Sequence, residues 1–356
     1  MFSRVKFFSE YIGLLKYVSF YLLILLFFLE KKYTFKSLIL FIIGILFSSL
    51  SVYYSGDYTP LKIFLLLFAS KSILFKDIIK FDFKSRLILF VIVISLSFLG
   101  LTNDNNIIKN GSLFYSFGFA HPNICAFMLT ILNLEFFYLN DCHFNIKTIF
   151  SFLFSFFFIL YNIYSRTNLI LLISFYIVWF LFKIIKAYRL FNFKPVKIIF
   201  ENLFLILTII TILISIQYSK NVDYVIALDN ILSGRIKFVN EFLSNYKINL
   251  FGNRLIFVSS EMYYLYGIAP HILDNCFINI LLRFGLCVYF LYYFILKKIV
   301  KMSLDNKEYF ILISLIILIL IGFSETYLLN IEYNVFLLYF NNYIFKKDNS
   351  FKNLTK

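Results

Sequence analysis

Long apolar runs alternate with short charged links along nearly the whole chain. Each run is close to the roughly 20 residues that a helix needs to cross a bilayer. The runs lie at Tyr11–Leu29, Ser37–Tyr54, Pro60–Phe75, Leu87–Leu101, Pro122–Leu139, Thr148–Tyr164, Thr167–Phe182, Val196–Ile216, Cys276–Leu296, Tyr309–Phe323 and Tyr327–Phe345. The sequence therefore predicts an all-α multi-pass integral membrane protein with about 11 transmembrane helices.

One long polar interval, from Ser219 to Asn275, interrupts this alternation. It sets the expected organisation: a membrane domain at 1–216 with spans one to eight, a loop at 217–275, a membrane domain at 276–345 with spans nine to eleven, and a tail at 346–356. Within the loop, apolar residues recur at helical spacing, at Ile236, Val239, Leu243 and Tyr246. This spacing predicts a short amphipathic helix lying on the membrane surface.

The charge pattern gives the expected orientation of the loop. The chain is 61% hydrophobic and carries a formal net charge of +15, with most Lys and Arg at the ends of apolar runs. They gather in the tail and in the links after odd-numbered runs, which are therefore predicted to be cytoplasmic. The remaining links hold few cations: Lys109, Arg166, Lys220, Arg235, Lys237, Lys247 and Arg254. The long loop is thus expected on the outer side. Basic and aromatic residues are not interleaved along one surface as in nucleic-acid-binding proteins, so we expect no nucleic-acid partner.

Two short polar elements are predicted to lie on the same outer side. In the segment 118–123 (GFAHPN), Pro122 suits the first turn of a helix, with His121 at its cap and Asn123 in the first turn. A helix start favours an anion such as phosphate, although an ordinary capped helix start explains the same residues. In the segment 165–167 (SRT), Ser165 can cap a helix, and Arg166 can grip phosphate or reach lipid headgroups.

The long loop adds further candidates. Gly234 allows a sharp turn, and Arg235 after it can reach a second phosphate or a sugar, or simply solvate a helix face. Asp274 suits an N-cap of the ninth span, or a general base that deprotonates a sugar hydroxyl. Arg283 lies within that span and needs a partner, for which Glu332 or a lipid phosphate are candidates.

These motifs together resemble those of the Wzy-type polysaccharide polymerases, members of the O-antigen ligase and polymerase superfamily. The blocks that carry the resemblance keep one order along the chain: 118–123 (GFAHPN), 165–167 (SRT), 233–235 (SGR), 251–252 (FG), 273–275 (LDN) and 281–285 (LLRFG). The resemblance implies a membrane-embedded glycosyltransferase of the bacterial cytoplasmic membrane with its active site on the extracytoplasmic face. Such an enzyme joins oligosaccharide repeat units carried on undecaprenyl pyrophosphate.

The resemblance also implies roles for residues. Arg166 and Arg235 would hold the diphosphates, Asp274 would activate the acceptor hydroxyl, and His121 would orient one of them. Further substrate-binding candidates are Asn123, Ser165, Gly234, Arg254, His271, Asn275 and Arg283. His271 is an alternative base. The resemblance implies no cofactor, nucleotide sugar or metal, and it implies membrane lipid and the flippase and chain-length regulator of the same pathway as partners.

Other functions remain open from the sequence. An O-antigen ligase-like transferase uses the same motifs, but Asp274-Asn275 in place of a His-Asn pair favours the polymerase. A flippase or transporter for lipid-linked sugars predicts a polar path and charged residues inside spans. A structural or sensory membrane protein would leave the shared outer face of the polar motifs unexplained.

Overall fold

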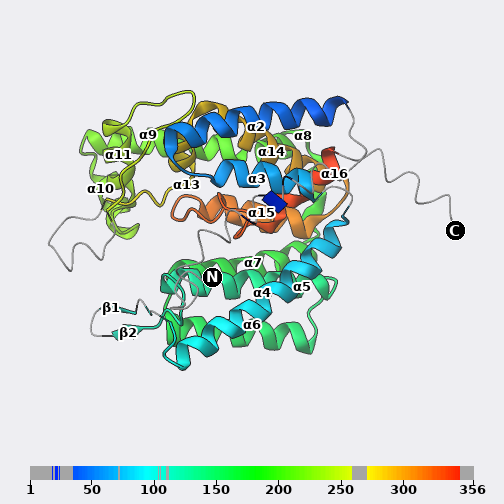
Figure 1. Ribbon diagram of the computed structural model, residues 1–356. Coiled ribbons are helices and arrows are strands. Elements are labelled where there is room, and N and C mark those ends of the chain that lie inside the picture. Colours follow the sequence, from blue (N-terminus) through cyan, green and yellow to red (C-terminus); the bar gives the residue numbers. More distant parts are fainter. Residues whose placement is uncertain are drawn as a thin grey trace. The chain divides into compact units, whose positions relative to one another are not determined.

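The structure is a computed structural model of the chain (Figure 1). It describes residues 18, 21–22, 24, 35–70, 73–102, 104, 106–109, 112–258 and 271–344. Contacts divide the chain into two compact units. Unit 1 takes residues 1–26 and 72–186, and unit 2 takes residues 27–71 and 187–356. Unit 2 thus combines the long loop with helices before and after it.

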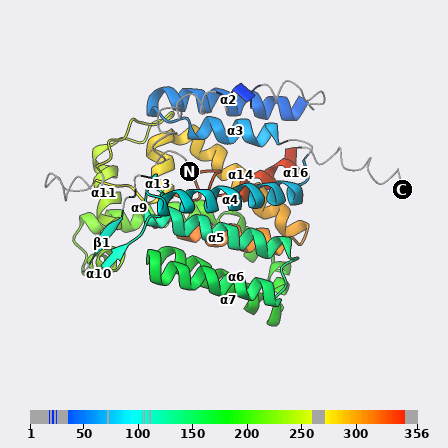
Figure 2. The ribbon, with the colours of Figure 1, turned by 60° about the horizontal axis from the view of Figure 1, so that its bottom comes forward.

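Unit 1 is a bundle of helices around α5. Its elements are α4 (Phe75–Phe98), the antiparallel strands β1 (Ile107–Lys109) and β2 (Ser112–Phe114), α5 (Pro122–Leu139), α6 (Ile146–Phe158), the π-helical turn η3 (Ile159–Ile163) and α7 (Arg166–Ile184). Helix α5 contacts α4, α6 and α7, as Figure 2 shows from below. Accordingly, α5 is buried on nearly all sides, and Phe127 and Phe137 are fully enclosed.

The helix ends of unit 1 follow from local sequence. Pro122 occupies the first turn of α5, and the Nδ1 atom of the cap residue His121 accepts a hydrogen bond from the Asn123 N–H at 3.0 Å. The prediction for this helix start is confirmed. Helix α6 begins with a capping box formed by Asn145 and Thr148, which satisfies two otherwise unpaired N–H groups.

Unit 2 is built around α14. Its elements are α2 (Phe35–Ser55), α3 (Thr59–Ala69), the 3₁₀ helix η4 (Ala187–Asn192), α8 (Lys194–Glu201), α9 (Leu203–Ser219), α10 (Asp223–Ile231), α11 (Arg235–Asn245), α13 (Cys276–Asn279), the π-helical turn η5 (Ile280–Phe284), α14 (Gly285–Asp305), α15 (Tyr309–Ile321), the 3₁₀ helix η6 (Val335–Phe340) and α16 (Asn341–Ile344). Helix α14 contacts α2, α8, α9, α15, η6 and α16. The amphipathic helix predicted in the loop is confirmed as α11, which buries Ile236, Val239 and Phe242.

A loop of unit 2 is fastened directly to the backbone of the long helix that starts at Cys276. The N–H groups of Leu286 and Cys287 donate to the carbonyls of Asn249 and Leu250, each at 3.0 Å. Gly252 lies against the helix so closely that a Cβ there would sit 2.1 Å from the Arg283 carbonyl oxygen. We call this contact between residues 249–253 and 282–287 the glycine clasp.

Five helices in the described residues are long and apolar enough to cross a membrane: Ser37–Ser55, Pro122–Leu139, Ile146–Ile163, Arg166–Ile184 and Cys276–Asp305. A sixth is added if α8 and α9 count as one span, although they are bent by 64° at Asn202. The chain is thus helical with several candidate spans, as expected for an all-α membrane protein. The predicted count of about 11 is not supported.

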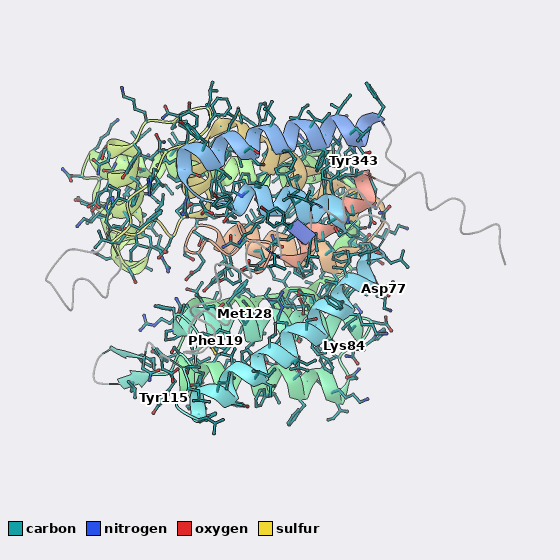
Figure 3. The ribbon with its side chains drawn as sticks, in the orientation of Figure 1. Asp77, Lys84, Tyr115, Phe119, Met128 and Tyr343 are labelled. Atoms are coloured by element: carbon teal, nitrogen blue, oxygen red, sulfur yellow. The ribbon has the colours of Figure 1, made fainter. Side chains whose placement is uncertain are left out.

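The missing spans have identifiable causes. Helices α3 and α15 have only 11 and 13 residues. Helix α4 has 24 residues, but its first half carries several charges, including exposed Asp77 and Lys84 (Figure 3). Residues 327–344 form turns, η6 and α16 in place of one helix. The first predicted run lies outside the described residues except for positions 18, 21–22 and 24, and the tail at 346–356 lies outside them entirely.

Candidate functional site

The two polar motifs of unit 1 meet through one buried side chain. The Nδ2 atom of Asn168, in the first turn of α7, donates to the Asn123 carbonyl at 3.1 Å and to the Ser165 Oγ at 2.8 Å. Asn168 is fully buried. It therefore ties the N-terminus of α5 to the N-terminus of α7, so that His121, Asn123, Ser165 and Arg166 belong to one cluster at one end of unit 1.

Arg166 is exposed at the first residue of α7. Its guanidinium carbon lies 5.7 Å from the centre of the Tyr164 ring, and Tyr164 itself adopts a left-handed conformation with φ 51° after the turn η3. Among the described residues, no carboxylate forms an ion pair with Arg166. An exposed guanidinium beside two helix N-termini suits an anionic ligand.

In unit 2 the central group is Arg235, the first residue of α11. Its Nε lies 3.7 Å from the Asp274 Oδ2, and its Nη2 donates to the Glu325 Oε1 at 3.2 Å. The guanidinium thus lies between two carboxylates. The resemblance placed Arg235 and Asp274 in one site, but no motif in the sequence includes Glu325.

A turn that precedes α11 fixes the position of Arg235. Gly234 has φ 80°, so it makes the sharp turn that its sequence context predicts. The buried carboxylate of Asp229 then accepts hydrogen bonds from the N–H groups of Ile236 at 2.7 Å and Lys237 at 3.1 Å. Asp229, rather than a cap residue adjacent to the helix, satisfies these N–H groups, and no sequence pattern marks it for this role.

Asp274 is not the helix cap that the sequence allowed. The cap of α13 is Asn275, whose Oδ1 accepts from the Ile278 N–H at 3.1 Å and whose Nδ2 donates to the Phe323 carbonyl at 3.2 Å. Asn275 therefore joins the start of α13 to the segment after α15, which carries Glu325. This junction leaves the Asp274 side chain available to Arg235.

The environment of Asp274 favours a proton-accepting role. Its side chain is 41% exposed, so it can reach a ligand from solvent. Partial burial raises the pKa of the Asp274 carboxyl above its usual range, and the Arg235 guanidinium opposes part of this rise. A carboxylate with a raised pKa is a stronger base than an ordinary aspartate.

His271 is held by neighbours of its own. Its ring stacks on Phe242 with centroids 4.0 Å apart, and its Nδ1 lies 3.4 Å from the Glu241 Oε2. Its backbone forms a short antiparallel bridge with Val258. His271 therefore has a packed position against α11, the helix that carries Arg235.

Arg283 and Arg254 form a separate group. Arg283 pairs with Asp57 in the α2–α3 turn, with Nη2 and Oδ2 2.9 Å apart, and lies over the Phe257 ring. The prediction of Glu332 as its partner is wrong, because Glu332 lies 3.8 Å from Lys62 instead. The exposed Arg254 approaches Gly56 in the same turn.

The predicted site residues thus form clusters within each unit. Unit 1 holds His121, Asn123, Ser165 and Arg166, and unit 2 holds Gly234, Arg235, Arg254, His271, Asp274, Asn275 and Arg283. That these clusters form one site stays a prediction. Asn168, Asp229 and Glu325 were missed because their partners are distant in sequence or lie across a turn.

Comparison with protein-family models, with curated proteins and with solved structures finds no match for this chain. The fold defines a helical protein with several candidate membrane spans. Its relation to the Wzy-type polymerases stays a prediction from the order of the motifs.

Proposed function

We propose that the protein is a polysaccharide polymerase that joins undecaprenyl-pyrophosphate-linked repeat units at the outer face of the bacterial cytoplasmic membrane. The observation that carries the proposal is the contact of Arg235 with Asp274. These residues are 39 positions apart and come from two of the motifs that resemble the polymerases. Their meeting supports a common role.

In the proposed reaction, the Asp274 carboxylate accepts the proton of the acceptor sugar hydroxyl. The hydroxyl oxygen attacks the anomeric carbon of the donor sugar, and the bond from that carbon to the pyrophosphate oxygen breaks. The lipid pyrophosphate leaves with the electron pair of that bond. The motif resemblance assigns a diphosphate to Arg166, because a guanidinium pairs bidentately with phosphate oxygens.

Arg235 receives a different role from the one that the resemblance implies. Two carboxylates already surround its guanidinium. A diphosphate at Arg235 would have to displace them or accept their repulsion. We therefore assign Arg235 and Glu325 to holding Asp274, and we keep the diphosphate role of Arg166 only as the resemblance implies it.

The test uses purified protein in liposomes with a lipid-pyrophosphate-linked repeat unit, and the products are separated on a gel. We expect a ladder of lengthening glycans with the native chain and no ladder with Arg166→Ala. Lys220→Ala is the matched control, because Lys220 is an exposed cation outside the proposed site. A full ladder from correctly inserted Arg166→Ala would refute the diphosphate assignment. A single glycan on another acceptor would identify a ligase.

A flippase for lipid-linked sugars is the second candidate, and one observation favours it. Unit 1 encloses charged side chains: Glu135 on the candidate span α5 is fully buried and lies 3.6 Å from the buried Arg86 on α4. Charged residues inside spans are typical of transport paths. Movement of the lipid across the bilayer, without a change in glycan length, would support this candidate over the polymerase.

A further inference from the structure

One surface of unit 2 combines exposed cations with exposed apolar side chains. It is formed by η4 and α8 and covers residues 187–201, and we call it the η4–α8 bracket. Its exposed large apolar residues are Tyr188, Leu190, Phe193, Ile198 and Ile199. Its cations are the exposed Arg189 and Lys194 and the half-buried Lys197, and the chain has no Asp or Glu from position 167 to position 200. Glu201 at the end of α8 is its one carboxylate.

The bracket is a folded part of unit 2. Phe191 packs edge-on against Phe200 with ring centroids 5.5 Å apart, and it also stacks on Tyr309 of α15. Helix α8 contacts α14. Tyr188 also stacks on Tyr309, whereas Leu190, Phe193, Ile198 and Ile199 remain exposed after the bracket has packed on unit 2.

The junction between α8 and α9 sets the angle at which the bracket leaves α9. Helix α8 is bent by 64° from α9 at Asn202, so the two cannot both follow one membrane-spanning axis. The Asn202 Oδ1 accepts hydrogen bonds from the Lys297 Nζ at 2.9 Å and the Tyr293 hydroxyl at 2.5 Å, both on α14. This polar contact fixes the bend. A short amphipathic helix at a steep angle to an apolar helix of spanning composition is typical of a membrane interface.

We propose that the η4–α8 bracket is a docking surface for anionic phospholipid headgroups of the adjacent leaflet. Phe193, Ile198 and Ile199 would enter the boundary between headgroups and acyl chains, while Arg189, Lys194 and Lys197 bind phosphate. Lysine and arginine at a membrane surface attract anionic lipid, and exposed apolar side chains are buried in the same step. An acidic protein partner would account for the cations but would leave these apolar side chains unexplained.

The test measures lipid binding and needs no catalytic activity. The full chain is purified in an uncharged detergent and titrated with short-chain phosphatidylglycerol or phosphatidylcholine, and the unfolding temperature gives the apparent affinity. We expect phosphatidylglycerol, and not phosphatidylcholine, to raise that temperature. Lys194→Gln with Lys197→Gln should weaken the apparent affinity roughly 30-fold, from the attraction of each cation near an anionic surface.

The matched control removes two cations elsewhere in unit 2, as Lys220→Gln with Lys247→Gln, both exposed in the long loop. It should keep the native response. Equal weakening in both double variants, or an equal response to phosphatidylcholine, would overturn the proposal. A third variant, Phe193→Ser with Ile198→Ser, keeps every charge and should also weaken binding. An unchanged response there would show headgroup attraction without insertion and would overturn the docking surface as proposed.

Discussion

Two arginines, one in each unit, are each paired with two carboxylates. In unit 1, Arg86 binds Asp82 at 2.5 Å and Glu135 at 3.6 Å, and the side chains of Arg86 and Glu135 are 5% and 0% exposed. In unit 2, Arg235 lies between Asp274, which is 41% exposed, and Glu325, which is 10% exposed. The chemical groups are the same, and solvent access differs.

This difference separates a structural role from a chemical one. A buried arginine and glutamate stabilise each other mainly while both are present. Glu135 alone would be an uncompensated charge in an apolar interior, and Arg86 alone would keep only the partly exposed Asp82. Arg86 and Glu135 therefore hold α4 against α5. The unit 2 group keeps one carboxylate within reach of a ligand, so that its protonation state can change at small cost to the fold.

The largest expected effect is on stability in unit 1. Replacing Glu135 with Ala leaves Arg86 without its fully buried partner, and we expect a loss of about 3–5 kcal/mol in the free energy of unfolding. Thermal or denaturant unfolding in detergent measures it. Glu332→Ala is the control, because its pair with Lys62 is largely exposed, and it should cost less than about 1 kcal/mol. Similar losses for the two variants would contradict the structural role of Glu135.

The next effect concerns activity in unit 2. Asp274→Asn keeps the size of the side chain but removes the base, so glycan polymerisation should fall by about 10²- to 10⁴-fold. The unfolding temperature should stay close to that of the native chain. Asp223→Asn, at an exposed carboxylate in the first turn of α10, is the control and should polymerise normally. Retained polymerisation in Asp274→Asn would remove Asp274 from the reaction.

A smaller effect is expected in the pH profile. A base acts when it is deprotonated, so the rate should rise with pH through the pKa of Asp274, which burial places above the ordinary aspartate range. Glu325→Gln removes a negative neighbour that shares Arg235. It should lower the pKa of Asp274 and move the acid limb of the rate profile to lower pH. A limb that stays in place would mean that Glu325 does not act on Asp274.

The smallest effect concerns the start of α11. Asp229→Ala leaves the N–H groups of Ile236 and Lys237 without their acceptor, and we expect a loss of about 0.5–2 kcal/mol in the free energy of unfolding. Polymerisation should fall as well, because Arg235 loses its fixed position. Ser244→Ala, near the other end of the same helix, tests whether any change in α11 has this result. Equal losses from both would argue against a specific role for Asp229.

Local sequence was sufficient where a structure depends on neighbouring residues. Helix α5 begins and ends at the residues that its apolar run predicts, and Gly234 and α11 follow from turn chemistry and helical spacing. Apolar length alone was misleading elsewhere. The run 196–216 contains no proline, yet the helix breaks at Asn202, whose side chain accepts hydrogen bonds from α14.

The candidate site shows the same limit. The residues of unit 2 that the motifs nominate are positioned by partners that the sequence does not mark. Asp57 pairs with Arg283 across 226 positions of the chain, and Asn275 rather than Asp274 caps α13. In the sequence, each partner is an ordinary polar residue, and only the fold brings it to its partner. The spacing within a motif therefore could not reveal these contacts.

The glycine clasp has a mechanical consequence. Backbone hydrogen bonds join residues 249–253 to the helix at 282–287, and Gly252 leaves no room for a side chain between them. This part of the loop therefore moves as one rigid piece with the helix, and any tilt of α14 is passed on to Arg254 and Arg283 together. A single methyl group at Gly252 would collide with the Arg283 carbonyl oxygen and would separate the loop from the helix.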